Sequence, residues 1–210
     1  GISQNVVEEV MLNVKFLPKV IEYDRFQPEF YEDTATYIGK RANIKKVNIG
    51  LKTYRKNKDL INQVEKKFKV EKELLLSLMG IETNFGKYLG KMDILSSLAT
   101  LSYDKRRSEF FTNELIIALK LIDNKKIKHD ELYGSWAGAF GNFQFMPSTI
   151  LNNAIDYNDD NLIDLKSTED SFASAANYLS KMGWNTKNKC FEEVILDKKI
   201  PIKYLNYSAR

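Results

Sequence analysis

Apolar residues recur every three or four positions along most of the chain, and this spacing is typical of helices that bury one face. Glycine and proline residues interrupt the pattern at intervals and mark helix ends. The predicted helices lie at 3–14 with Ser3 as the cap, at 29–41, at two segments between 43 and 68 that part near Asn57, at 74–86, around 94–101, at 106–122, from Pro147 onward, and up to Met182.

The tail of the chain has a different pattern. Residues 191–196 and 200–205 are rich in β-branched and aromatic side chains around a Lys-rich turn, which predicts two short strands. Neither an internal repeat nor a linker divides the sequence. The expected fold is therefore mainly α, one helical unit with a short C-terminal strand appendage.

Two of the predicted helices carry long apolar stripes. In the helix at 106–122 the residues expected to face the core are Phe110, Phe111, Leu115 and Leu119. In the helix at 74–86 they are Leu74, Leu75, Leu78, Met79 and Ile81. These two helices are expected to contribute much of the hydrophobic core.

The helix at 74–86 ends by presenting one acid, Glu82, close to Gly86. Desolvation and the negative end of the helix dipole both raise the pKa of a carboxyl at such a place. A raised pKa is what a general acid needs near neutral pH. Spacing alone favours a plainer alternative, in which Glu82 is a solvated residue in a frayed last turn.

Composition narrows the class of protein. A hydrophobic content of 43% in 210 residues is that of a globular chain with a sizeable core. The net charge of +4 is mild, and the Lys-rich runs between 43 and 68 lack interleaved aromatic residues, so no nucleic-acid partner is expected. The single cysteine, Cys190, excludes an internal disulfide, and the single histidine, His129, excludes a His-based triad.

Two further stretches carry candidate chemistry. Residues 134–148 interleave glycines with aromatic residues, which suits either a loop that approaches a ligand closely or tight chain packing. Residues 156–166 resemble the start of an EF-hand loop, with oxygen-bearing side chains at Asp156, Asn158 and Asp160. Asn161 stands at the glycine position and Ser167 at the twelfth, so a turn without metal remains the alternative.

An ordered set of motifs along nearly the whole chain resembles the membrane-bound lytic murein transglycosylase B family. The motifs are Asp24-Arg-Phe-Gln-Pro-Glu-Phe30, Gly80-Ile-Glu-Thr-Asn-Phe-Gly86, Leu95-Ser-Ser-Leu-Ala-Thr-Leu101, Arg106-Arg-Ser-Glu-Phe-Phe111, Gly134-Ser-Trp-Ala-Gly138, Gln144-Phe-Met-Pro-Ser148, the Asp156 loop, Ala176-Asn-Tyr178 and Gly183-Trp184. The order of the motifs, more than any one of them, carries the resemblance.

The resemblance implies a lysozyme-like helical core with a groove for glycan strands, and it assigns roles that spacing does not. Glu82 falls on the position of the family's catalytic acid. Ser135, Gln144, Tyr178 and Arg107 fall on positions that contact the glycan or its peptide stems. The implied ligands of a structural Ca²⁺ are Asp156, Asn158, Asp160, the Leu162 carbonyl and Asp170, with no cofactor for the chemistry itself.

The resemblance also implies a function and a domain organisation. The expected reaction is cleavage of the MurNAc–GlcNAc bond with formation of 1,6-anhydromuramic acid ends, in cell-wall turnover. The alternatives are a hydrolytic muramidase and a non-catalytic peptidoglycan-binding module. The expected parts are an N-terminal helical region (1–70), a lysozyme-like catalytic core with the calcium loop (71–185), and a short, truncated strand region (186–210).

The expected partners and location follow from the same resemblance. A monomer bound to peptidoglycan glycan strands, and to proteins of cell-wall synthesis, is expected in the periplasm or at the outer membrane.

Overall fold

The computed structural model describes residues 1–27, 32–187, 195, 198–199 and 201, and this part of the chain is mainly helical, as predicted. The helices are α1 (Gln4–Met11), α2 (Pro18–Arg25), α3 (Thr34–Arg41), α4 (Ile44–Lys56), α5 (Lys58–Phe68), α6 (Lys72–Thr83), α7 (Ile94–Tyr103), α8 (Ser108–Asp123), the 3-10 helix η2 (His129–Glu131), α9 (Pro147–Asn153) and α10 (Thr168–Lys181). The strands predicted at 191–196 and 200–205 fall, apart from 195 and 201, outside the described residues.

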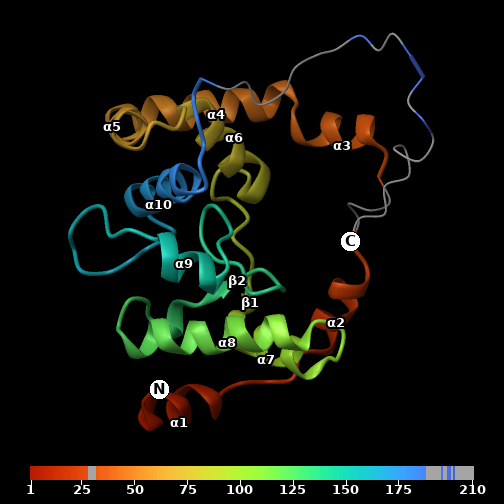
Figure 1. Cartoon of the computed structure of the whole chain (residues 1–210), viewed down its shortest axis with the longest axis vertical. Coiled ribbons are helices and arrows are strands. Elements are labelled where there is room, and N and C mark those ends of the chain that lie inside the picture. The colour runs from red at the N-terminus through yellow and green to blue at the C-terminus, as the bar shows by residue number, and fades with distance from the viewer. Residues whose placement is uncertain (28–31, 188–194, 196–197, 200, 202–210) are drawn as a thin grey trace.

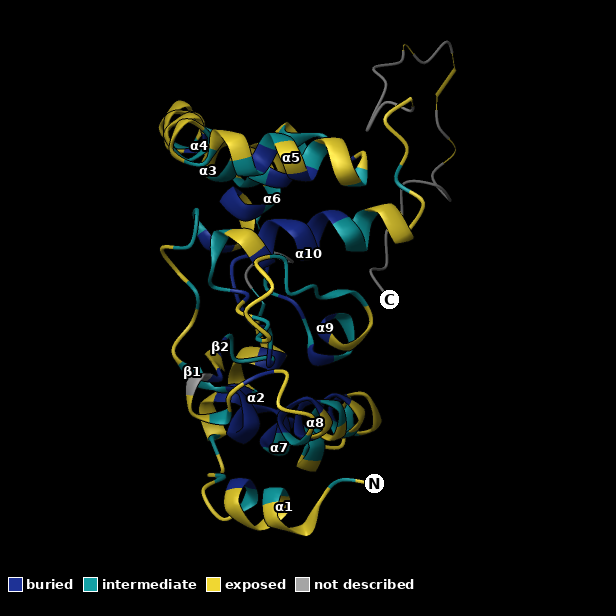
Figure 2. Cartoon of the chain, turned by 90° about the vertical axis from the view of Figure 1, so that its left-hand side faces the viewer, coloured by how far each residue is buried: buried dark blue, intermediate teal, exposed yellow. Residues whose placement is uncertain are grey.

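The helices form two packed groups, one at each end of the long axis of the molecule, with α9 and the loops around it between them (Figure 1). At one end α7 and α8 pack together, with α1 against α8 and α2 against α7. At the other end α4 packs on α6, and α5 packs on α10. Helix α9 lies between them and contacts both α8 and α10. Buried residues concentrate along α7, α8 and α10, whereas α1, α3 and α4 are largely exposed (Figure 2).

A two-stranded antiparallel ribbon, β1 (Met92–Asp93) with β2 (Tyr133–Gly134), was not predicted from the sequence. Met92 pairs with Gly134, and Asp93 with Tyr133. Two residues per strand are too few for an alternating pattern to be recognised. The ribbon fixes where the loop after β2 begins, next to the start of α7.

Side-chain caps and left-handed residues account for many helix ends. The side chains of Asp33, Asn43, Asp93 and Ser167 each accept a hydrogen bond from the backbone amide three residues later, at the starts of α3, α4, α7 and α10. The helix predicted at 29–41 therefore begins only at Thr34. Gly183, with φ of +90°, follows α10 as predicted.

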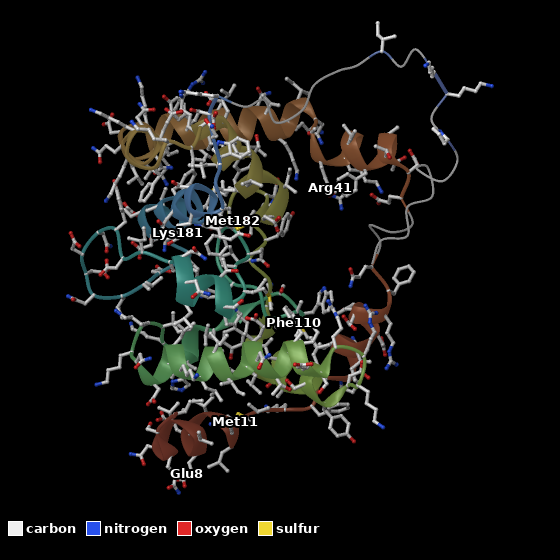
Figure 3. The ribbon with its side chains drawn as sticks, viewed as in Figure 1. Glu8, Met11, Arg41, Phe110, Lys181 and Met182 are labelled. Carbon is white, nitrogen blue, oxygen red and sulfur yellow. The ribbon has the colours of Figure 1, made fainter. Side chains whose placement is uncertain are left out.

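Three predicted details are wrong. Ser3 precedes α1, but its hydroxyl donates to Asp123 Oδ1 at 2.6 Å instead of capping the helix. Ile81 and Phe110 were expected in the core, yet they are 47% and 48% exposed (Figure 3 labels Phe110 on α8). The residues that α6 and α8 bury most fully include Leu75, Met79 and Phe111, because those faces meet neighbouring helices.

Among the described residues, no helix combines the length and the apolar character needed to cross a bilayer.

Candidate active site

The end of α6 places Glu82 through an unusual run of backbone conformations. Asn84, Phe85 and Gly86 all have positive φ values, of 52°, 61° and 78°. The Phe85 amide donates to the Met79 carbonyl at 3.1 Å and so closes the last turn of the helix. Asparagine and glycine tolerate the left-handed region, but phenylalanine does so at a cost, so the surroundings must hold Phe85 there.

The ring of Phe85 occupies a space that two glycines leave open. A Cβ atom on Gly80 would lie 2.7 Å from the ring, and one on Gly50 of α4 would lie 3.1 Å from it. Both distances are too short for an added methyl group to fit without a shift. Lys46 adds a polar contact from α4, because its Nζ donates to the Gly80 carbonyl at 2.9 Å. Helix α4 thus fixes the turn that follows Glu82.

Thr83, directly after Glu82, joins α6 to the loop that precedes α9. Its buried hydroxyl donates to the Asn142 carbonyl at 2.8 Å and accepts from the Gly86 amide at 2.9 Å. The buried side chain of Asn142 in turn donates to the carbonyls of Lys166 and Ser167, at 3.0 and 3.2 Å, just before α10. One network of buried hydrogen bonds therefore positions the acid, the loop and the start of α10.

Glu82 borders a pocket of about 260 Å³ between α6, the loop and α10. The pocket is lined by Leu78, Glu82, Phe143, Gln144, Phe145, Met146, Thr149, Ala175, Tyr178 and Leu179. The Glu82 side chain remains accessible to solvent, yet the protein around it removes enough water to raise its pKa by desolvation. This direction agrees with the sequence argument for a general acid.

Gln144 and Tyr178, two of the residues that the resemblance assigns to the glycan, line the same pocket. Gln144 has a φ of 51°, and its amide nitrogen donates to the carbonyls of Gly141 and Leu89, at 2.9 and 3.3 Å. Within the described part of the chain its amide oxygen makes no hydrogen bond, so the oxygen is available to a ligand. The Tyr178 ring stands edge-on to Phe145 with centroids 5.7 Å apart, which orients its polar tip.

Ser135 and Arg107 do not line this pocket. The Ser135 hydroxyl accepts from the Ala139 amide at 2.9 Å and holds the turn after β2. Arg107 forms an ion pair with the buried Asp24 of α2, and its guanidinium lies 4.8 Å from the centre of the Phe111 ring. Arg106 joins the same cluster through its Nε, 3.3 Å from Asp24 Oδ2. In this structure both arginines tie α2 to the start of α8.

In the loop at 156–166, side-chain oxygen atoms accept hydrogen bonds from backbone amides of the same loop. Asp156 and Asn158 accept from the Asp160 amide at 3.1 and 3.2 Å, and Asp160 accepts from the Leu162 amide at 2.8 Å. Asn161 has a φ of 72°, the conformation that its place at the glycine position requires.

The predicted late ligand of this loop, Asp170, is fully buried and accepts from the amides of Tyr157 and Asp164, each at 2.8 Å. Burial, with a smaller contribution from Asp156 and Asp160, raises the pKa of Asp170. Among the residues that the structure describes, no group of three or more His, Cys, Asp or Glu side chains is arranged to hold a metal. The donors are nevertheless all oxygen atoms with excess negative charge, which is the chemistry that a hard cation requires.

The chemistry that the pocket permits rests on one carboxyl group. Among the described residues that line it, Glu82 is the only acid. Glycosidases that use an external nucleophile commonly employ two carboxyl groups, so this pocket suits a reaction in which one group serves as acid and then as base. The aromatic and amide side chains around Glu82 suit a sugar, which offers both apolar faces and hydrogen-bonding groups.

Sequence reasoning missed the residues that position this acid. Neither Thr83 nor Asn142 lines the pocket, and no motif indicates that the two are in contact. They meet only because the fold brings together residues that are 59 positions apart. No local signal marked either residue, because Thr83 stands between the polar residues Glu82 and Asn84 and Asn142 stands in a loop. The burial of Asp24 could not be predicted from the sequence either, because its partner, Arg107, lies 83 positions away.

Comparisons with known proteins agree on the family. The family described as "Transglycosylase SLT domain" matches residues 1–209. Membrane-bound lytic murein transglycosylase B of Escherichia coli strain K12 is 36% identical over 139 residues, which is 66% of this chain and 38% of that protein. The chain therefore spans well under half of this relative's length.

Solved structures share the fold. SltB3 of Pseudomonas aeruginosa, in complex with NAG-NAM-pentapeptide, superposes with a TM-score of 0.84 and 33% identity over 88% of this chain and 50% of that one. The Escherichia coli lytic transglycosylase Slt35, in complex with calcium, gives a TM-score of 0.78 and 32% identity over 87% of this chain and 59% of that one. The lysozyme-like helical fold expected from the sequence is confirmed.

Proposed function

Because this chain belongs to the Transglycosylase SLT domain family, we propose that it is a lytic transglycosylase that cleaves the glycan strands of peptidoglycan. The observation that carries the proposal is the desolvated carboxyl group of Glu82, which stands in a pocket whose described lining holds no second acid. The relatives SltB3 and Slt35 support it, since SltB3 was solved with a NAG-NAM-pentapeptide.

The proposed reaction uses Glu82 twice. Protonated Glu82 first donates its proton to the glycosidic oxygen between MurNAc and GlcNAc, and the bond from C1 of MurNAc to that oxygen breaks. The carboxylate then takes the proton of the C6 hydroxyl of the same MurNAc, whose oxygen attacks C1 and closes the 1,6-anhydro ring. An internal nucleophile has a very high effective concentration, which makes a second carboxylate unnecessary.

The other pocket residues hold the glycan in this proposal. The free amide oxygen of Gln144 accepts a hydrogen bond from an acetamido or hydroxyl group of the sugar. Tyr178 packs along the sugar and offers its hydroxyl. We assign Ser135 to the continuation of the glycan beyond the pocket, and Arg107, whose guanidinium is partly exposed, to the carboxylates of the peptide stem.

We further propose that the loop at 156–170 holds a structural Ca²⁺. Asp156, Asn158, Asp160, the Leu162 carbonyl and Asp170 would supply its oxygen ligands, and the cation would offset the charge repulsion that contributes to the raised pKa of Asp170. The calcium complex of Slt35 supports this assignment. None of these residues lines the pocket around Glu82, so the role of the cation is stability and not chemistry.

The setting of the enzyme completes the proposal. We place it in the periplasm or at the outer membrane, as a monomer that meets cell-wall synthesis proteins on peptidoglycan. The proposed parts are the helical region 1–70, the catalytic core 71–185 and the strand region 186–210.

The products released from purified sacculi test the function. Mass spectrometry of muropeptides is expected to show 1,6-anhydromuramic ends, which only an internal nucleophile gives. Reducing ends would instead identify a hydrolytic muramidase, since water would then be the nucleophile. Retention on sacculi without any release would identify a glycan-binding module.

A further inference from the structure

The end of the molecule formed by α3, α4 and α5 is far more basic than the rest of the chain. Residues 34–69 contain 11 of the 32 Lys and Arg residues but only 2 of the 28 Asp and Glu residues, so the remainder of the chain carries an excess of acids. One of those two acids, Glu65, is paired with Lys72 of α6 at 3.0 Å. The mild net charge of the protein therefore conceals a strong separation of charge.

Four of the five cations of α4 lie on one exposed side of that helix, and the fifth, Lys46, contacts the Gly80 carbonyl of α6. Lys45, Lys52 and Lys56 are seven and four residues apart, which places them on the same side, and Arg55 lies beside them. All four are exposed, and none makes an ion pair within the part of the chain that the structure describes. Their charges are thus directed to the solvent and to whatever approaches this end.

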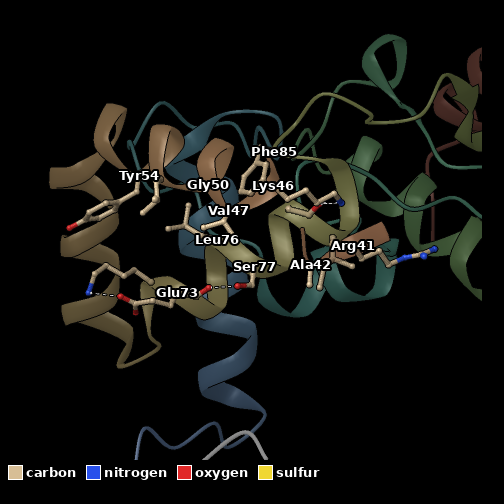
Figure 4. Close-up of a pocket in the computed structure, with 14 residues that line it drawn as sticks. Arg41, Ala42, Lys46, Val47, Gly50, Tyr54, Glu73, Leu76, Ser77 and Phe85 are labelled. Carbon is tan, nitrogen blue, oxygen red and sulfur yellow. Dashed lines mark hydrogen bonds and ion pairs between the residues drawn. The ribbon is translucent and has the colours of Figure 1, made fainter. Parts of the chain in front are cut away.

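Aliphatic side chains border this basic side of α4. Ile44, Val47 and Leu51 are 70%, 51% and 46% exposed, and their spacing of three and four residues places them in one row along the helix. Val47 and Leu51 also line an apolar groove of about 380 Å³ between α4 and α6, which Figure 4 shows with Gly50, Tyr54 and Leu76 in its wall. An exposed aliphatic row next to an unpaired basic row is an amphipathic arrangement typical of helices that lie in a membrane interface.

We propose that this end of the protein, defined by Ile44, Lys45, Val47, Leu51, Lys52, Arg55 and Lys56, docks on the surface of a bilayer that contains anionic phospholipid. The lysines and arginine would contact the phosphate groups, while the aliphatic row and the groove would receive the upper part of the acyl chains. Charge complementarity favours an anionic surface, and the exposed aliphatic row favours lipid over a purely polar polyanion.

Docking through this end is compatible with an open active site. The groove between α4 and α6 and the pocket around Glu82 share no lining residue, although both border α6. A bound molecule would therefore keep the pocket accessible to glycan strands near the membrane. The inference goes beyond the proposed function and does not depend on catalysis.

Vesicle co-sedimentation of residues 1–210 tests the inference. Binding is expected to vesicles of phosphatidylcholine with phosphatidylglycerol and not to vesicles of phosphatidylcholine alone, and it should weaken as salt is added. The triple variant Lys45→Glu, Lys52→Glu, Lys56→Glu should bind at least about tenfold more weakly, because each cation near an anionic surface contributes measurably. Leu51→Ser should weaken binding without changing the salt dependence.

A matched variant provides the control. Lys105, Lys120 and Lys125 are exposed lysines at or beside the opposite end formed by α7 and α8, and reversing all three should leave vesicle binding unchanged. Equal loss in both triple variants, or no binding to the anionic vesicles, would overturn the inference. The inference would also be overturned if the wild-type chain did not bind the vesicles and the α4 variant instead lost retention on sacculi. Loss of self-association in sedimentation velocity by that variant, again without vesicle binding by the wild type, would count against it in the same way. The turnover of soluble glycan fragments, measured without vesicles, reports separately on the proposed function.

Discussion

Replacing Thr83 with valine keeps the size of the side chain but removes the hydroxyl that joins the end of α6 to the loop before α9. The hydroxyl donates to the buried Asn142 carbonyl at 2.8 Å and accepts from the Gly86 amide at 2.9 Å. A buried polar group left without its partner costs about 1–3 kcal/mol. Water can reach the amide of the half-buried Gly86, so the cost comes mainly from the Asn142 carbonyl. We expect the free energy of unfolding to fall by roughly 2–3 kcal/mol.

The same change should affect turnover through the position of Glu82. If the end of α6 shifts by about 1 Å, the rate can fall on the order of a hundredfold, because the proton must be transferred at a defined place. We expect kcat to fall by roughly tenfold or more with little change in KM, since Thr83 does not line the pocket. Denaturant unfolding measures the stability, and turnover of soluble glycan fragments measures kcat and KM.

Thr83→Ser is the matched control, because it keeps the hydroxyl and loses one methyl group. It should cost about 1 kcal/mol of stability and preserve most of kcat. If the valine and serine variants were equally stable and equally active, the hydroxyl would not position the acid, and the role given to the Thr83–Asn142 network would be wrong.

Three further outcomes are expected. Gln144→Ala should weaken glycan binding and lower the melting temperature modestly, because the side chain also donates to the Gly141 and Leu89 carbonyls, whereas Asn152→Ala, on the exposed side of α9, should leave glycan binding unchanged in the same assay. Calcium should raise the melting temperature and EDTA should lower it, and Asp160→Ala should remove the difference, because a ligand that binds only the folded state stabilises it. Turnover should fall as the pH rises through the raised pKa of Glu82, since the protonated form starts the reaction; a pH profile flat across that range would contradict this.

The sequence predicted the helices well where local signals agree. Helix α5 follows the predicted break near Asn57 and buries Ile61 and Val64, α9 begins at Pro147, and α10 is followed by Gly183. In each case the apolar spacing and the end signal come from neighbouring residues, so no knowledge of the tertiary structure is needed.

The sequence did not predict which residues are buried where burial depends on which neighbouring helix covers that side of the helix. Ile81 follows the apolar spacing of α6, yet it borders the groove beside α4 and remains exposed. Nothing in the local sequence indicated that Asp24, on another helix, would be buried against Arg107, and the assignment of Arg107 to the substrate stays a prediction. Long-range pairs of this kind carry no periodic signal.

The position of Glu82 was predicted for a reason that the structure supports in part. Desolvation raises its pKa, as argued from the apolar helix. The three left-handed residues after α6, and the fit of the Phe85 ring against Gly50 and Gly80, could not be inferred, because they require α4 to approach α6 closely. The sequence singled out Glu82 as a candidate, and the tertiary structure explains what holds its part of the chain in place.

Turnover by Glu82→Gln tests the central claim most directly. The substitution keeps the shape of the side chain but removes the transferable proton, so the rate should fall by at least about 10²–10⁴. Stability should hold or rise at neutral pH, because the folded chain raises the pKa of Glu82 and its ionised form is disfavoured there; the gain should disappear as the pH falls below the unfolded pKa. A stable variant that no longer releases muropeptides is the predicted result, and undiminished release of anhydro ends would contradict the account.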